Sequence, residues 1–325
     1  MLLNKNKKIM NFIIISIFVD IILASSIVLL TYFFNYKLSK RNVLVPTLSP
    51  AEGSGLNIKT ADIFLEDWKD KFKDKFSEKV VVTESSYKSK NVSIDITKNE
   101  IGSGNDKITY YLADIYISNI TCFKTEFAKN TYGLAYDESL EDMSTKKNAI
   151  LAINGDSYNG EKNIGTIIKN GIIYKDKITK TDVCVLYKNG EMKTYSKYLF
   201  DTQKVISKGA YQTWSFGPNL LDKNGKKICD FETLEYLKKR HPRTAIGYYE
   251  PGHYAFLVVD GRDTGYSKGM TLEELSALFE NLGCKVAYNL DGGKSSSMLF
   301  MNNVVNNLGK QGRNVNNGIF IVEDE

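Results

Sequence analysis

The sequence predicts an α+β fold, in which a β-rich domain built on a mixed sheet carries one strand–helix–strand unit near its C-terminus and follows one transmembrane helix. Three observations support this prediction. Apolar runs of β-branched and aromatic residues, separated by Asn-Gly and other turn sequences, fill much of residues 84–325. One helix with clear start and stop residues lies between two apolar strands in the last third of the chain. A long apolar segment begins at residue 11.

The N-terminus has the layout of a membrane anchor, because a short head, residues 1–10, precedes the apolar segment Asn11–Phe34. As a helix this segment would extend about 36 Å, which is enough to cross a bilayer. Its single charge, Asp20, costs about 3 kcal/mol to insert, and the many aliphatic residues outweigh that cost. A cleaved signal peptide is the alternative, because Ala24-Ser25-Ser26 is a small-residue patch, but the apolar run continues past it.

We therefore expect an uncleaved, single-pass anchor with the C-terminal domain outside the cytoplasm. Basic residues balance on the two sides of the segment, so they do not decide the orientation. The orientation rests instead on the layout of a short head before one span and a large domain after it. The membrane is thus an expected partner of the chain.

Residues 35–83 predict a linker followed by an amphipathic stalk helix. The stretch Ala51-Glu52-Gly53-Ser54-Gly55 and two nearby prolines have the composition of a flexible connection. Beyond it, Thr60–Ser77 repeats apolar residues at helical spacing with charges between them. We expect this helix to pack on the domain, and the membrane surface is the alternative. Residues 84–325 are expected to form the folded domain.

Two β-hairpins are predicted by Asn-Gly pairs. Asn-Gly favours a tight hairpin turn because both residues tolerate positive φ. The first hairpin joins Ile164–Ile168 to Ile172–Tyr174 through Asn170-Gly171, and the second joins Val183–Tyr187 to Glu191–Tyr195 through Asn189-Gly190.

The strand–helix–strand unit runs from Tyr254–Val259 through the helix Thr271–Leu282 to Lys285–Leu290. Thr271 and Glu274 have the spacing of a capping box, which marks the start of the helix. If the two strands are parallel neighbours joined by a right-handed crossover, their C-terminal ends lie on one rim of the sheet.

Three apolar strands end in an aspartate beside glycine. Asp156 follows Ile150–Ile153, and Asp260 and Asp291 follow the two strands of the unit just described. Ligands of open α/β sheets bind at the carboxyl ends of strands. The three carboxylates are therefore expected to line one site.

Other side chains near these aspartates carry donors suited to a phosphate or a sugar. Arg243 precedes a strand, and a guanidinium can clamp a phosphate through two parallel hydrogen bonds. Gly292 and Gly293 let the backbone approach a ligand, although the run is not a P-loop, because Tyr288 replaces its first glycine. The candidate substrate-binding residues are Asn154, Arg262, Asn289, Gly292, Gly293, Lys294, Ser295 and Ser296.

Composition argues against two classes of protein. The net charge of +5 comes mostly from scattered lysines, and no dense Lys/Arg block interleaved with aromatic residues is present, so we expect no nucleic-acid partner. Two histidines, and four cysteines without a C-x-x-C pair, argue against a His/Cys zinc site. The sequence requires no cofactor. A structural divalent cation, the disulfide state and the oligomeric state stay open.

Five segments of the chain occur together in a recognisable order: Asn154-Gly155-Asp156 with Gly165, Arg243-Thr244-Ala245-Ile246-Gly247, Asp260-Gly261-Arg262, Gly269–Leu275, and Asn289–Gly293 with Ser295-Ser296. In these segments the chain resembles the phosphodiester glycosidase family, and the resemblance covers roughly residues 84–325. Lys294 departs from the family pattern, because it stands where a third glycine is usual, so the identity of the substrate does not transfer.

The resemblance implies a glycosidase that hydrolyses the glycosidic bond of a sugar-1-phosphodiester, in a surface glycan or wall polymer. It assigns phosphate clamping to Arg243 and the nucleophile or base to Asp156, Asp260 or Asp291. The division of roles and the choice between retention and inversion stay open, because they depend on the separation of the carboxylates. The sugar, the aglycone and the pathway stay open as well.

Two other functions are compatible with the sequence. A non-catalytic glycan-binding or assembly protein could keep the same fold, and Lys294 motivates this alternative. A metal-dependent phosphodiesterase would cleave the P–O bond instead, and the scarcity of histidine argues against it.

Overall fold

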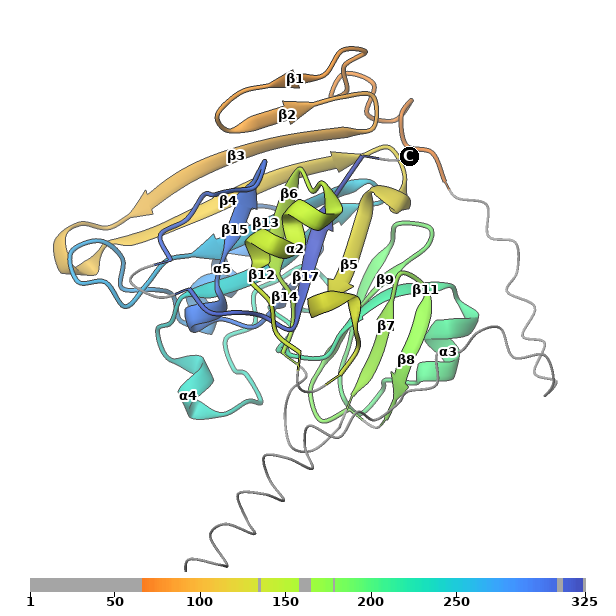
Figure 1. The fold of residues 1–325 in the computed structure, drawn as a ribbon. Coiled ribbons are helices and arrows are strands. Elements are labelled where there is room, and N and C mark those ends of the chain that lie inside the picture. Colours follow the sequence, from red (N-terminus) through yellow and green to blue (C-terminus); the bar gives the residue numbers. More distant parts are fainter. Residues whose placement is uncertain (1–65, 134–135, 158–164, 178, 309–311, 324–325) are drawn as a thin grey trace, which may run out of the picture. The chain divides into compact units, whose positions relative to one another are not determined.

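The computed structural model describes residues 66–133, 136–157, 165–177, 179–308 and 312–323 (Figure 1). The predicted head, the transmembrane segment Asn11–Phe34 and most of the linker lie outside the described residues. Within the described ranges, no helix combines the length and the apolar composition that a bilayer crossing needs.

A seven-stranded antiparallel sheet forms the larger layer, in the order β1-β2-β3-β4-β13-β12-β14. Its longest pair, β3 and β4, is a hairpin that projects beyond the neighbouring strands (Figure 1). The strands are β1 (Val81–Val82), β2 (Ser86–Lys88), β3 (Val92–Ile101), β4 (Ile108–Ile117), β12 (Arg243–Glu250), β13 (His253–Val259) and β14 (Val286–Asn289).

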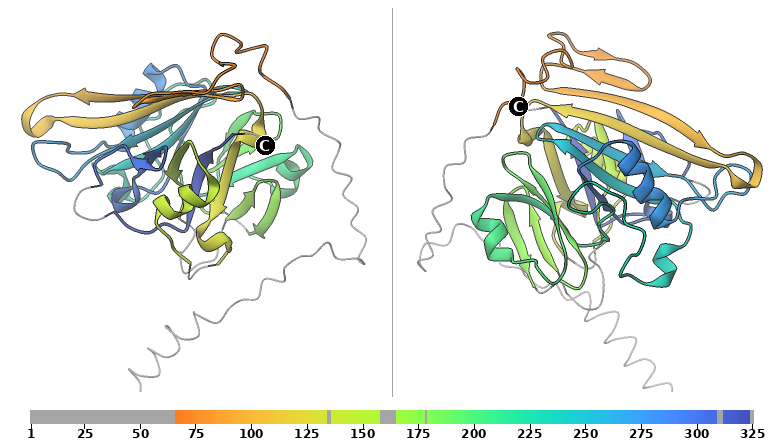
Figure 2. Two further views of the ribbon diagram at one scale, coloured as in Figure 1. Left: turned by 45° about the horizontal axis from the view of Figure 1, so that its top comes forward. Right: turned by 180° about the vertical axis from the view of Figure 1, so that it is seen from behind.

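A five-stranded antiparallel sheet, in the order β16-β15-β6-β17-β5, forms the second layer (Figure 2). The C-terminal end of β6 lies beside the starts of β15 and β17, because β6 is antiparallel to both. The strands are β5 (Phe123–Phe127), β6 (Leu151–Asn154), β15 (Met298–Phe300), β16 (Asn303–Val304) and β17 (Asn317–Ile321).

Two smaller sheets, β10-β9-β11 and β7-β8, lie between β6 and β12 in the sequence. They are joined to each other by hydrogen bonds from Ile168 N–H to Thr213 Oγ1 and from Thr213 Oγ1 to Thr166 O. The strands are β7 (Thr166–Lys169), β8 (Ile172–Asp176), β9 (Val183–Tyr187), β10 (Met192–Tyr195) and β11 (Ala210–Trp214).

The main hydrophobic core lies between the two large sheets. Ile94 and Phe256 of the seven-stranded sheet share one buried cluster with Ile153 and Ile319 of the five-stranded sheet. Burial of this apolar surface is the main stabilising contribution to the layered arrangement.

Helices cover the outer faces of both large sheets. On the seven-stranded sheet, Leu275 and Phe279 of one helix pack in a cluster with Leu257. On the five-stranded sheet, Leu140 of another helix packs in a cluster with Phe320. The helices are α2 (Leu140–Lys147), α3 (Thr202–Ser207), α4 (Glu235–Lys238) and α5 (Leu272–Asn281), and the 3-10 turns are η2 (Gly104–Asp106), η3 (Ile120–Cys122), η4 (Ala128–Asn130) and η5 (Gly293–Ser295).

The predicted β-rich α+β fold with few helices is confirmed, but the mixed sheet is wrong. Every strand pair in the described part of the chain is antiparallel. The strands expected to be parallel neighbours, β13 and β14, are separated by β12. The tight turn at Pro251-Gly252, where Gly252 has φ +88°, returns the chain from β12 directly into β13.

The ends of β13 and β14 nevertheless lie at one edge of the sheet, as expected. Because β13 and β14 both run antiparallel to β12, they run in the same direction. Asp260 and Asp291 therefore follow their strands at the same edge of the sheet. The two aspartates thus share an edge of the sheet although β13 and β14 are not neighbours.

Structural features that depend on residues close together in the sequence were predicted correctly in two cases. The capping box of α5 is present, with Thr271 Oγ1 accepting from Glu274 N–H and the Glu274 carboxylate accepting from Thr271 N–H. Asn170 and Gly171, in the turn between β7 and β8, both have positive φ, as predicted. In the β9–β10 hairpin only Gly190 has positive φ, at +76°, so that turn has a different geometry.

The predicted stalk helix Thr60–Ser77 is not a helix in its described part, where residues 69–75 form turns. Trp68 is 4% exposed and belongs to the main core, with its ring in the space beside Gly190 and Gly252. The backbone N–H of Trp68 donates to Ser118 O at 2.6 Å, so it is unavailable for a hydrogen bond within a helix. The aromatic spacing therefore reflects packing of this segment on the domain.

Candidate functional site

The candidate site lies where ends of the two large sheets meet. Thr244, at the start of β12, donates its hydroxyl to Asn154 Oδ1 at 2.7 Å, and Asn154 is the last residue of β6. Both side chains are fully buried, with exposures of 0% and 1%. This hydrogen bond joins the two sheets at the edge where β13 and β14 end.

Asn154 also connects the turns that carry two of the predicted aspartates. Its Nδ2 donates to the Asp291 carbonyl at 2.7 Å, and its Oδ1 accepts from Ser297 N–H at 3.2 Å. Asp291 N–H in turn donates to Gly155 O at 3.3 Å. Asn154 is one of the residues expected to bind substrate, and in the structure its amide hydrogen-bonds to these protein groups.

Asp291 lies in a cluster of polar side chains at the surface. Its Oδ2 accepts from Ser295 Oγ at 2.7 Å and from an Arg313 guanidinium nitrogen at 2.6 Å. Arg313 Nε also donates to Ser295 Oγ at 2.5 Å. The Asp291 side chain is 16% exposed and that of Arg313 51%, so both are accessible to a ligand.

Arg313 was missed in the sequence. It lies 22 residues after Asp291, outside every motif, and no local pattern distinguishes it from other surface arginines. Only the return of the chain into β17, which lies beside β6, brings it to the site.

Asp156 is held in a buried position next to the Asp291 turn. Its Oδ2 accepts from Ser215 N–H at 3.0 Å, and its Oδ1 lies 3.6 Å from Lys169 Nζ. The Asp156 residue is 5% exposed. The contacts of Asn154 and Gly155 therefore hold the turns that carry Asp156 and Asp291 next to each other.

Asp260 is buried and hydrogen-bonds the segment that follows β16. Its Oδ1 accepts from Asn306 Nδ2 at 2.8 Å, and its Oδ2 accepts from Tyr266 OH at 2.9 Å and Asn307 N–H at 3.0 Å. The same Asn306 amide donates to Ser296 O at 3.2 Å. Burial raises the pKa of Asp260, and these hydrogen bonds oppose the rise. We therefore assign Asp260 a positioning role.

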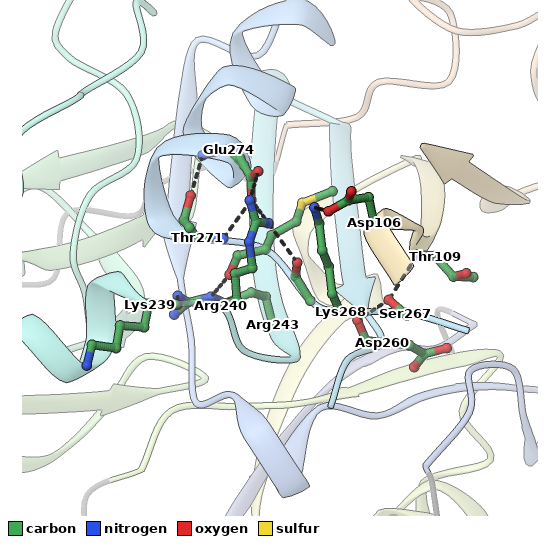
Figure 3. A network of polar contacts seen from close by, with 12 residues as sticks. Asp106, Thr109, Lys239, Arg240, Arg243, Asp260, Ser267, Lys268, Thr271 and Glu274 are labelled. Carbon is green, nitrogen blue, oxygen red and sulfur yellow. Dashed lines mark hydrogen bonds and ion pairs between the residues drawn. The ribbon is translucent and has the colours of Figure 1, made fainter. Parts of the chain in front are cut away.

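Arg243 does not present its guanidinium to a ligand (Figure 3). Its Nε donates to Met270 O at 2.9 Å, and one terminal nitrogen donates to Leu237 O at 2.8 Å and Lys239 O at 2.5 Å. The residue is 3% exposed, and burial lowers its pKa to about 10. The expected phosphate clamp is thus occupied by backbone carbonyls, because the start of β12 lies beneath α4 and the loop before α5.

We expect Arg243→Met to lower the free energy of unfolding by about 1–3 kcal/mol, because the guanidinium of this buried residue donates to three backbone carbonyls, two of which have no other donor among the described residues. Chemical denaturation of the soluble domain measures this change. Arg240→Met is the matched control, since its ion pair with Glu274 is partly exposed and should cost less than about 1 kcal/mol. A variant of Arg243 with unchanged stability and a raised KM would instead support the clamp.

Arg262, Gly292 and Gly293 form the opposite side of the Asp291 turn. Gly292 lies against the chain, since a Cβ there would be 2.8 Å from Pro242 O, and Gly293 N–H donates to the same carbonyl at 2.9 Å. Gly293 has φ +68°, which favours glycine. Arg262 is exposed and donates toward Tyr236 OH and His241 Nδ1. These glycines therefore shape the turn by packing on the protein backbone.

Several buried polar atoms around the aspartates have no hydrogen-bond partner among the described residues. An unpartnered buried polar atom costs about 1–3 kcal/mol, so such a group indicates a place built to meet donors and acceptors of a ligand. Asn289 keeps its Nδ2 on Gly217 O at 2.8 Å but leaves its Oδ1 unpartnered. The unpartnered atoms are Asp156 Oδ1, Asn289 Oδ1, Ser296 Oγ, Ser297 Oγ and Asn317 Oδ1.

A cleft of about 320 Å³ opens beside the Asp291 cluster. Lys294 and Arg313 line it with positive charge, Glu141 contributes one negative charge, and Ser297 adds a hydroxyl. Ser295 does not line the cleft, and its hydroxyl lies between Asp291 and Arg313. Leu140, Leu308 and Val315 also line the cleft, which therefore combines two cations with an apolar wall.

The described residues include no group of three or more His, Cys, Asp or Glu side chains arranged to hold a metal ion. All four cysteines are free thiols: Cys122, Cys184 and Cys284 are buried, and Cys229 is exposed.

Known proteins are similar to this chain in sequence and in fold. A sequence model of phosphodiester glycosidases matches residues 147–322. The chain is 34% identical over 183 residues to the SPbeta prophage-derived uncharacterized protein YomE of Bacillus subtilis (strain 168). The matching segment is 54% of this chain but only 28% of the length of that relative. The fold is similar to that of the zebrafish N-acetylglucosamine-1-phosphodiester alpha-N-acetylglucosaminidase catalytic domain auto-inhibited by pro-peptide, with a TM-score of 0.58, 18% identity, and coverage of 72% of this chain and 84% of that one.

Proposed function

This chain belongs to the phosphodiester glycosidase family, and on that premise we propose that it is a membrane-anchored, extracytoplasmic hydrolase that cleaves the glycosidic bond of a sugar-1-phosphodiester in a surface glycan or wall polymer. The observation that carries the proposal is the arrangement of Asp291 beside Arg313 at the cleft that Lys294 lines. Arg313 connects the two features, because it pairs with Asp291 and lines the cleft together with Lys294, which supports binding of a phosphorylated sugar at this cleft.

The cations account for recognition of the phosphodiester. Its phosphate carries one negative charge, and a guanidinium such as that of Arg313 can donate to two of its oxygens in parallel. Arg313 takes the clamping role that the sequence suggested for Arg243, whose guanidinium is bound to carbonyls. The hydroxyls of Ser296 and Ser297 supply hydrogen-bonding groups that suit sugar hydroxyls.

The carboxylates account for the chemistry. Water adds its oxygen to the anomeric carbon, the bond from that carbon to the phosphate oxygen breaks, and a phosphate monoester leaves as an anion. Because this leaving group is already stable as an anion, strong acid assistance is not required. Asp156 and Asp291 supply the base and the carboxylate that stabilises positive charge at the anomeric carbon or attacks it.

The membrane anchor of the proposal rests on the apolar composition of Asn11–Phe34 and the short basic head before it. Protease treatment of intact cells tests it. Removal of the C-terminal domain by external protease supports an extracytoplasmic domain, and protection of the domain until lysis contradicts it.

Hydrolysis of a panel of sugar-1-phosphodiesters in ¹⁸O water tests the reaction itself. Label in the released sugar supports cleavage of the glycosidic bond. Label in the phosphate product would instead indicate a phosphodiesterase that cleaves the P–O bond. No turnover of any member by a folded protein would favour a non-catalytic glycan-binding or assembly protein.

We expect Lys294→Gly, which restores the usual third glycine of the family, to raise KM about tenfold, because a charge-assisted hydrogen bond to the substrate is lost. Steady-state kinetics on the substrate identified by the panel measures this change. Lys90→Gly is the control, since Lys90 lies in the exposed turn between β2 and β3 and pairs with Glu78. An unchanged KM in Lys294→Gly would remove Lys294 from the recognition of phosphate.

A further inference from the structure

Lys169 is a buried cation that the reaction described above does not use. It is the last residue of β7 and is 2% exposed. Its Nζ donates to Thr213 O at 3.0 Å and lies 3.6 Å from Asp156 Oδ1. The ammonium also lies 5.3 Å from the centre of the Trp214 ring, within the range of a cation–π contact.

Stability alone does not explain this pair. Transfer of two charges into a protein interior costs several kcal/mol per ion, and apolar residues of similar volume often replace a buried ion pair without loss of stability. Burial lowers the pKa of Lys169, and the charge of Asp156 opposes this shift. The pair therefore points to a role in the neighbouring site.

The geometry of Asp156 indicates what that role is. Its Oδ2 is fixed by Ser215 N–H, whereas Lys169 Nζ, at 3.6 Å, is close enough to stabilise the charge but too far for a hydrogen bond to Oδ1. Oδ1 has no hydrogen-bond partner among the described residues. The carboxylate is thus held in place by one oxygen while the other keeps its lone pairs for a donor.

Among the described titratable groups, Lys169 is the cation that pairs with Asp156. Lys175 of β8 is also buried, and burial lowers its pKa, with Asp156 opposing at longer range. Cys184 of β9 and Tyr288 of β14 have pKa values raised by burial, so both are neutral at physiological pH. Tyr288 OH donates to Asp182 O at 2.6 Å.

We propose that Lys169 is a positioning residue that places a positive charge beside the Asp156 carboxylate and orients it, so that Asp156 Oδ1 accepts the proton of the attacking water. This inference rests on the proposed function. As the oxygen of water bonds to the anomeric carbon, one O–H bond breaks and its proton goes to Oδ1, while the electron pair of the glycosidic bond leaves with the phosphate oxygen. The proton then returns to solvent, and Asp291 stabilises the positive charge that develops on the sugar.

The pH dependence of activity in Lys169→Met tests this role. A buried carboxylate without its cation takes up a proton at higher pH, so we expect the acid limb of the kcat/KM profile to move up by about one pH unit or more. Lys169→Arg, which keeps the charge, should return the limb toward that of the native protein. Lys188→Met is the matched control, because Lys188 lies in the β9–β10 turn and makes no ion pair with Asp156, and it should leave the limb in place.

A double-mutant cycle separates an effect through Asp156 from a general loss of structure. In the Asp156→Asn background, Lys169→Met should change kcat/KM by less than twofold, because the carboxylate on which it acts is gone. A loss as large as in the native background would overturn the proposal. So would an unmoved acid limb in Lys169→Met.

A measurement that does not need turnover separates this inference from the proposed function. The ¹³C chemical shift of the Asp156 carboxyl carbon at neutral pH should differ between Lys169→Met and the native chain, because the cation beside the carboxylate is gone. An identical chemical shift overturns the role of Lys169, whereas a changed chemical shift in a protein without turnover leaves the pairing intact and rejects the glycosidase function. If Lys169→Met does not fold, Lys169→Gln, which keeps a donor for Thr213 O and removes the charge, serves for the same measurements.

Discussion

Asp291→Asn is expected to lower kcat/KM for a sugar-1-phosphodiester by about 10²- to 10⁴-fold, the range that a positioned carboxylate contributes to catalysis. The substitution keeps the size of the side chain and an oxygen that can accept from Ser295 Oγ. It removes the negative charge that faces Arg313 and, in the complex, the anomeric carbon. Most of the loss should appear in kcat, because this charge interacts most strongly with the transition state.

The control for this prediction is Asp95→Asn, because Asp95 is an exposed aspartate on β3 and faces away from the main core. Circular dichroism and thermal unfolding should show that both variants fold as the native chain does. If Asp291→Asn retained more than a tenth of the native kcat/KM while folded, Asp291 would have no direct part in the reaction.

Asn154→Ala is expected to lower the free energy of unfolding by about 3 kcal/mol or more and to reduce activity as well. The truncation leaves the Asp291 carbonyl without its donor, and the Thr244 hydroxyl and Ser297 N–H without their acceptor. Each unpartnered buried group costs about 1–3 kcal/mol. Because the same amide fixes the Asp291 turn against the end of β6, the carboxylate also loses its orientation.

Denaturant unfolding and steady-state kinetics on the same samples measure the two effects. Asn303→Ala is the matched control, because Asn303 is exposed and donates only to Met301 O two residues away, so its loss should stay within about 0.5 kcal/mol. Full activity in an Asn154→Ala protein that folds would show that Asp291 does not depend on this support.

The sequence was sufficient for features that a few adjacent residues determine. The capping box of α5 follows from the spacing of Thr271 and Glu274, and the β7–β8 turn follows from Asn170-Gly171. The strand ends that carry Asp156 and Asp291 could also be predicted, because an apolar run followed by aspartate and glycine marks where a strand stops.

The remaining site residues could not be assigned from sequence because their roles depend on distant partners. Arg243 looks like a phosphate ligand until the carbonyls of α4 and the loop before α5 surround it. Lys169 and Arg313 look like ordinary basic residues until β7 and the approach to β17 bring them to Asp156 and Asp291. Charge and residue type were visible in the sequence, whereas the partner that decides their use was not.

The hydrogen bond from Asn154 to the Asp291 carbonyl joins residues 137 positions apart in the chain. Contacts of such long range form after the loop between them has closed, and closing it costs chain entropy. Neither a fragment that ends before β14 nor one that begins after β6 contains both sides of this contact. The candidate site is therefore assembled only when the two large sheets dock, so a fragment that lacks either segment cannot form it.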